Sequence, residues 1–201
     1  MSNRLNSKAI GQFLIIIGTI SIFAFIFLII FYAGYLNDIP SILFFGPLND
    51  VFGALEAILT AILALYVLSV QGRRWLLLNS IGMVPSWIGA FIVTIDSLMA
   101  GGIISAASAS ILKIKYDFPP LLAIHDLHFG FGLIGIWLLI LNIQAIQNRS
   151  WPTHLIGLGF ITSIIMIFGL TGNSSLGFVI LYPVWCIWLG WHILKSRQAE
   201  N

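Results

Sequence analysis

Four ionisable residues interrupt apolar stretches of the sequence. His125 and His128 form an H-x-x-H pair at the start of one stretch, and Glu56 and Asp96 lie within two others. Residues three apart lie on one face of a helix, so both imidazoles can approach the same ion. Two imidazole nitrogens with one or two carboxylates form a ligand set that suits zinc or non-haem iron. A water molecule on such a metal becomes nucleophilic near neutral pH, and this chemistry would give a membrane-embedded, metal-dependent hydrolase.

The same four residues permit two other interpretations. Because histidine titrates near neutrality, the set could relay protons and couple them to the transport of a small solute. The inner half of the predicted helices offers this path only Asn79, Ser86, Asn142 and Thr162, so a pocket open to one side fits the sequence better. Alternatively, the four groups form a hydrogen-bonded structural network, because ionisable groups within a membrane indicate function without specifying it.

A second pair of histidines, His154 and His192, lies near the ends of two further apolar stretches. Two imidazoles on facing helices can ligate a b-type haem. Trp151 and Trp191 lie nearby, however, and amphipathic rings of this kind also gather at membrane interfaces without binding a cofactor. The pair therefore predicts either a haem site or part of an aromatic belt.

The composition places the chain in a lipid bilayer. Hydrophobic residues make up 59% of its 201 residues, charged residues only 8%, and the mean hydropathy is +1.03. Soluble domains carry roughly a quarter charged residues, which this chain lacks. The net charge of +2 is too small to indicate a nucleic-acid partner. Cys186 is the one cysteine, so no disulfide can form within the chain.

The apolar stretches predict an all-α fold of six membrane-spanning helices. About 20 residues cross the hydrocarbon core, and turn-like breaks such as NDIPSILFFGPLND, QGRR, QNRS and TGNSS separate the stretches. The first stretch is too long for a signal-peptide core, so we expect it to be retained. Residues 1–201 are predicted to form one domain, with spans at about Ile10–Tyr35, Val51–Val70, Trp75–Met99, Leu121–Ile146, Trp151–Thr171 and Leu176–Leu194.

The basic residues predict the orientation. Lysine and arginine collect on the cytoplasmic side of membrane proteins. In a six-span alternation, only Lys113 and Lys115 fall on the opposite side from the others. Both termini are therefore predicted to be cytoplasmic, and the expected location is a prokaryotic plasma membrane. The residues on the cytoplasmic side are Arg4, Lys8, Arg73, Arg74, Arg149, Lys195 and Arg197.

Polar and small residues share one face of the third and fourth spans, at steps of three, four, three and seven residues. If these faces pair in antiparallel helices, Asp96 lies level with both histidines at the outer end, and Asn79 lies level with Asn142 at the inner end. The glycines would allow the two backbones to approach closely. The faces comprise Asn79, Gly82, Ser86, Gly89 and Asp96 on the third span, and His125, His128, Gly132, Gly135 and Asn142 on the fourth.

These faces predict an outer-facing polar pocket between the second, third and fourth spans. Glu56 would lie about 9 Å below the outer boundary, too deep to reach water easily. A kink at Pro85 could widen the pocket. The candidate pocket residues are Asn49, Glu56, Ser86, Asp96, His125 and His128, of which Glu56, Asp96, His125 and His128 are the candidate metal ligands.

The favoured function is that of a binding or accessory membrane protein, with the hydrolase and the proton-coupled transporter as alternatives. Because glycine-lined helix faces also serve oligomers, the partner could be another membrane subunit or a second copy of the chain. The long outer segment at residues 100–120 could form a short interfacial helix or an irregular loop.

Overall fold

The computed structural model describes residues 2–70, 76–100, 127–148, 150–171 and 177–198. Every element in this part of the chain is helical, and six stretches are long and apolar enough to cross a membrane, as the sequence predicted. The chain is thus a multi-pass membrane protein. Its elements are α1 (Ser2–Leu36), η1 (Pro40–Ile42), α2 (Phe45–Val70), α3 (Leu76–Ala100), α5 (Leu127–Asn148), α6 (Thr153–Phe168), η4 (Gly169–Thr171) and α7 (Gly177–Gln198).

The prediction of a turn-like break across residues 37–50 is wrong over much of its length. η1 lies within this segment, and α2 begins at Phe45 rather than near Val51. Pro47 falls in the first turn of α2. Backbone N–H groups in the first turn have no partner within the helix, so the N–H that proline lacks is not needed there. Glu56 is consequently eleven residues, or about 16 Å, from the start of the helix.

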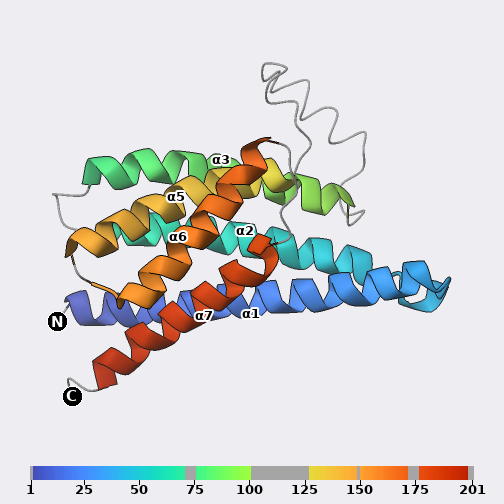
Figure 1. Ribbon diagram of the computed structural model, residues 1–201, viewed down its shortest axis with the longest axis horizontal. Coiled ribbons are helices and arrows are strands. Elements are labelled where there is room, and N and C mark those ends of the chain that lie inside the picture. The colour runs from blue at the N-terminus through green and yellow to red at the C-terminus, as the bar shows by residue number, and fades with distance from the viewer. Residues whose placement is uncertain (1, 71–75, 101–126, 149, 172–176, 199–201) are drawn as a thin grey trace.

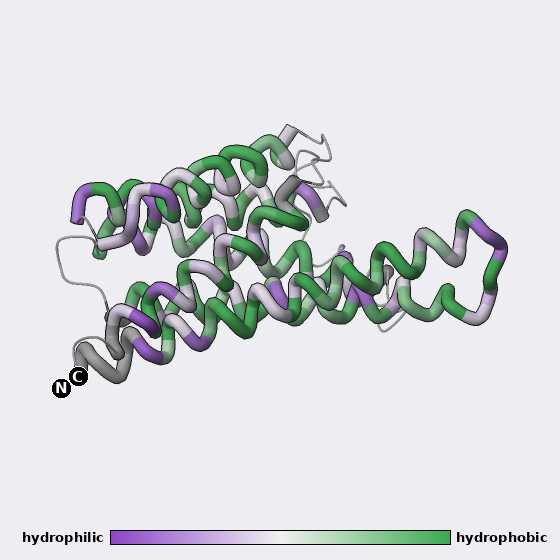
Figure 2. Tube along the Cα trace, turned by 60° about the horizontal axis from the view of Figure 1, so that its bottom comes forward, coloured by the Kyte–Doolittle hydropathy of each residue, from purple (hydrophilic) through white to green (hydrophobic). Residues whose placement is uncertain are grey.

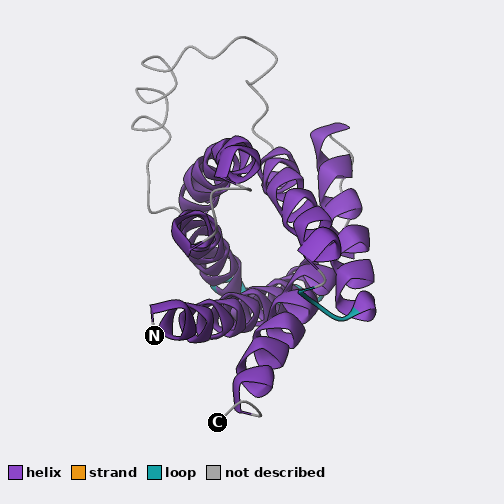
Figure 3. Ribbon diagram, turned by 90° about the vertical axis from the view of Figure 1, so that its left-hand side faces the viewer, coloured by secondary structure: helices purple, strands orange, loops and turns teal. Residues whose placement is uncertain are grey.

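The six long helices form a closed ring. Each packs against the next along the chain, and α7 returns to pack against α1. Figure 3 views the ring almost along its axis, and Figure 1 shows α1 beginning close to the place where α7 ends. We call this end of the ring the terminal end, and the end where α1 joins α2 the hairpin end. The tip of the α1–α2 hairpin projects beyond the other helices, as Figure 2 shows.

Glycines allow the helices to approach closely where the ring closes and where α3 meets α5. A Cβ on Gly190 of α7 would lie 2.6 Å from the carbonyl oxygen of Gly11 of α1. A Cβ on Gly130 of α5 would lie 2.8 Å from the carbonyl oxygen of Gly89 of α3. Any larger residue at these positions would push the backbones apart, so small side chains fix both crossings.

The two sides of the ring differ in their side chains. The interior holds large residues that are almost fully buried, including Ile17, Trp137, Tyr182 and Trp185. The outer surface exposes many apolar side chains, as expected of helices that face lipid rather than water.

Candidate functional site

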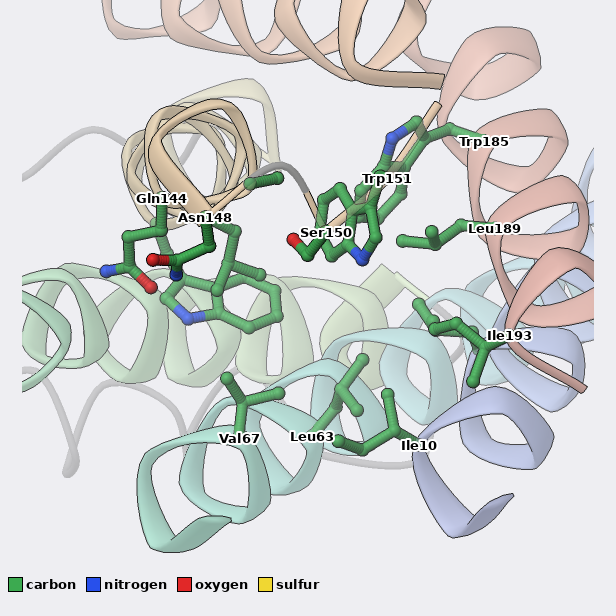
Figure 4. Close-up of a pocket in the computed structure, with 14 residues that line it drawn as sticks. Ile10, Leu63, Val67, Gln144, Asn148, Ser150, Trp151, Trp185, Leu189 and Ile193 are labelled. Atoms are coloured by element: carbon green, nitrogen blue, oxygen red, sulfur yellow. The ribbon is translucent and has the colours of Figure 1, made fainter. Parts of the chain in front are cut away.

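A cavity of about 280 Å³ lies inside the ring at the terminal end, and Figure 4 shows it in close-up. Its walls come from α1, α2, α5 and α7, with the connection between α5 and α6. Three tryptophans, Trp137, Trp151 and Trp185, supply aromatic surface. The remaining apolar lining is aliphatic: Ile10, Leu14, Leu63, Val67, Leu141, Ala145, Leu189 and Ile193.

The polar lining of the cavity gathers on one side, at the end of α5. Gln144, Asn148 and Ser150 supply it, as Figure 4 shows. Asn148 and Ser150 are exposed, whereas Gln144 is buried, so this polar side forms the mouth of the cavity. Gln144 is held in place because its Nε2 donates to Oδ1 of Asn79 on α3 at 2.6 Å. A ligand could therefore bury an apolar body among the indoles and bond a polar end at the mouth.

Aromatic contacts hold the tryptophan wall. The rings of Trp151 and Trp185 meet edge to face, with centroids 5.9 Å apart. The ring of Tyr182 stacks on Trp185 at 6.5 Å, with 17° between the ring planes. Offset and edge-to-face contacts of this kind restrict the rings, so the wall is largely formed before any ligand enters.

The outer edge of Trp185 rests on a glycine of α6. A Cβ on Gly159 would lie 2.5 Å from Nε1 of Trp185 and closer still to Oδ1 of Asn142. Asn142 cannot easily swing away, because it is fully buried and its Nδ2 donates to the carbonyl oxygen of Leu138 at 2.8 Å. Only glycine at position 159 lets the indole lie where it lines the cavity.

Five buried side chains lie deeper in the ring, towards the hairpin end: Ser21 on α1, Glu56 and Thr60 on α2, and Tyr182 and Cys186 on α7. We call them the Glu56 cluster. Glu56 is 7% exposed and shares a hydrogen bond with Ser21. The hydroxyls of Thr60 and Tyr182 bond each other at 2.8 Å. Glu56 also interacts electrostatically with Tyr182 and Cys186. The structure gives this carboxyl no ion pair among the residues that it describes.

The Glu56 cluster and the cavity form successive layers of the ring interior. On α2, Glu56 precedes the cavity residue Leu63 by seven residues, which is about 10 Å along the helix. Thr60 lies between them, and its partner Tyr182 stacks on the cavity residue Trp185. A carboxyl group thus lies behind the deep wall of an aromatic cavity.

The predicted outer pocket, which includes His125, stays a prediction. Glu56 bonds α1 and interacts with α7, although the sequence grouped it with the third and fourth spans. His125 lies outside the described residues, as does the outer segment 101–126. Asp96 and His128 are half-buried, and each has an interaction partner. Asn49 donates to Oδ1 of its neighbour Asp50 at 3.0 Å.

Ser86 is fully buried next to Pro85, and its Oγ has no hydrogen-bond partner in the described part of the chain. Within the described ranges, no three His, Cys, Asp or Glu residues are grouped so that they could hold a metal ion. A site that also uses His125 stays a prediction.

The predicted pairing of the third and fourth spans is partly wrong. Gly89 of α3 does pack against α5, but it meets Gly130. Gly132 and Gly135 pack instead against η4 and α6. Asn79, which was predicted to lie level with Asn142, accepts a hydrogen bond from Gln144, two residues further along α5. Asn142 packs against Gly159 of α6. The polar face of α5 therefore points largely towards α6.

The proposed haem ligands lie at the surface of the ring. His154 is exposed, and its ring lies 5.0 Å from that of Trp188. His192 is half-buried on α7. Haem binding by this pair stays a prediction.

The sequence also marks several interior residues that lie outside the predicted pocket. Ser21, Thr60 and Tyr182 are polar residues in the middle of apolar spans, where each needs a partner. Gln144, two residues after Asn142, is a further polar residue of this kind.

Comparison of the chain with protein-family models, with curated proteins and with solved structures gives no match.

Proposed function

We propose that this chain is a binding protein of the membrane, with both termini in the cytoplasm, which takes up a small amphipathic molecule through the terminal end of the ring. The observation that carries the proposal is the cavity of about 280 Å³ with aromatic and aliphatic walls and a polar mouth. Ligand sites are typically concave and mostly apolar, with a few polar groups that fix the orientation of the ligand.

The size of the cavity limits the ligand. An apolar cavity of about 150 Å³ accepts benzene, so this one has room for a substituted single ring or a short branched chain. The indoles would contact the apolar body, and Gln144, Asn148 and Ser150 would bond a hydroxyl or amide at the mouth. The positive-inside rule supports a cytoplasmic mouth, since Lys8 and Lys195 belong to the terminal end.

The experiment titrates the detergent-solubilised chain with 4-bromobenzyl alcohol and follows tryptophan fluorescence, because bromine quenches indoles that it contacts. We expect saturable quenching. Ala145→Phe places a ring in the cavity, and Ile146→Phe places the same ring at the next position, where the side chain is 51% exposed outside. The first variant should lose saturable quenching and the second should keep it. Quenching that never saturates, or that both variants keep, would contradict the proposal.

A further inference from the structure

The cavity and the Glu56 cluster together indicate which charge a ligand should carry. No charged side chain lines the cavity in the described part of the chain, and three indoles line it. Indole faces attract cations through the ring quadrupole. The carboxyl of Glu56 lies behind this aromatic wall, without a cationic partner among the described residues.

The partial charges at the helix ends also favour a positively charged ligand. The cavity lies towards the carboxyl ends of α2, α5 and α7, and towards the amino ends of α1 and α6, so carboxyl ends outnumber amino ends by three to two. Carboxyl ends of helices carry partial negative charge. Lys195 does not cancel this effect inside the cavity, since its ammonium lies 4.8 Å from the ring centre of Trp191, which is 54% exposed on the outside.

We propose that the ligand is a small hydrophobic organic cation, such as a quaternary ammonium ion with an aromatic or branched apolar group, and that Glu56 supplies its counter-charge. This inference rests on the proposed binding function and names its ligand class. The cationic head lies against the indoles at the deep end of the cavity and faces the Glu56 cluster. The apolar body lies along the indoles and the aliphatic walls, and a hydroxyl or amide on that body can still bond Gln144, Asn148 or Ser150 at the mouth.

The same arrangement couples cation binding to a proton. A buried carboxylate without a counter-ion is costly, so the empty site holds Glu56 as the neutral acid. Arrival of the cation supplies the counter-charge, and the proton leaves the Glu56 carboxyl for bulk water. The titratable groups that face Glu56 are Tyr182 and Cys186 on α7, neither of which can carry positive charge, and Ser21 faces it from α1. Cation affinity therefore rises as the pH rises.

Two probe ligands of equal shape, one cationic and one neutral, test whether the site prefers a positive charge. Benzyltrimethylammonium is the cation, and neopentylbenzene replaces its nitrogen by carbon. In Glu56→Gln, we expect affinity for the cation to fall about tenfold, which is the effect of a unit charge roughly 10 Å away at an effective dielectric constant of about 20. Affinity for the neutral probe should not change. Asp50→Asn makes the same chemical change on the same helix, away from the cavity, and should affect neither probe.

Each outcome decides between the two proposals. If neither probe binds to the natural chain, the proposed binding function fails together with this inference. If both bind but Glu56→Gln leaves cation affinity unchanged, or weakens both probes equally, only the choice of a cation is overturned. Proton release from the unaltered chain is a second measurement that needs no variant. A pH dye in weak buffer should record release on addition of the cation and none with the neutral probe; equal signals would overturn the coupling.

Discussion

Gly159 and Gly157 provide a matched test of how α6 supports the cavity wall. Both are in the same helix, two residues apart, and both can be replaced by alanine. A Cβ at position 157 would have no neighbouring atom within 4 Å. A Cβ at position 159 would meet Nε1 of Trp185 at 2.5 Å and the fixed side chain of Asn142. The two substitutions therefore have the same intrinsic helix preference and opposite packing consequences.

Alanine in place of glycine inside a helix adds about 0.5–1 kcal/mol of stability, so Gly157→Ala should stabilise the protein by about that amount. Overpacking a filled interior costs about 1–3 kcal/mol. After the helix gain of about 0.5–1 kcal/mol is subtracted, Gly159→Ala should be destabilised by a net of about 0–2.5 kcal/mol and should be less stable than Gly157→Ala by the full packing cost. Reversible unfolding in mixed detergent micelles, followed by circular dichroism, measures both free energies. A Gly159→Ala protein as stable as Gly157→Ala would refute the described packing of Trp185 and Asn142 on α6.

Three further predictions concern the interior and the orientation. Thr60→Val and Tyr182→Phe should each lower the free energy of unfolding by about 1 kcal/mol. Because both variants remove the same buried hydrogen bond, the loss in the double variant should be less than the sum of the two. Additive losses would argue against that bond. Asn79→Leu should cost about 1–2 kcal/mol, since it removes a buried acceptor at 2.6 Å from its glutamine partner; an unchanged unfolding midpoint would contradict this. A membrane-impermeant maleimide should label Ser41→Cys in intact cells, and Ser196→Cys only after the membrane is opened; the reverse pattern would place the termini outside.

The six spans could be predicted because hydropathy depends only on local sequence. Length and apolar character identify each helix, and the structure describes six helices that are long and apolar enough to cross a membrane. The sequence does not predict the start of α2, because the segment NDIPSILFFGPLND holds prolines, a glycine and asparagines, which are typical of turns. Pro47 fits the first turn of a helix as well as it fits a turn, and the sequence alone does not distinguish these positions.

The partners of the polar residues could not be predicted. Helix periodicity shows which side chains share one face of a helix, but it does not show which other helix packs against that face. The sequence pattern groups Glu56 with the spans that follow it along the chain. In the ring, α2 packs between α1 and α3, and closure by α7 brings Tyr182 to Thr60 across 122 positions. The small residues Gly11 and Gly190 mark this closure, but nothing in their spacing identifies them as a pair.

The most direct test of the central claim is a fluorine NMR titration of the chain labelled with 5-fluorotryptophan, with benzyl alcohol as the probe and Trp→Phe variants for assignment. If a small molecule binds inside the ring, the resonances of Trp137, Trp151 and Trp185 shift and saturate. Those of Trp87, Trp188 and Trp191, which are 43–54% exposed on the outer surface, stay in place. Saturable shifts of the outer three, with the cavity three unmoved, would place the ligand on the lipid-facing surface and contradict the account.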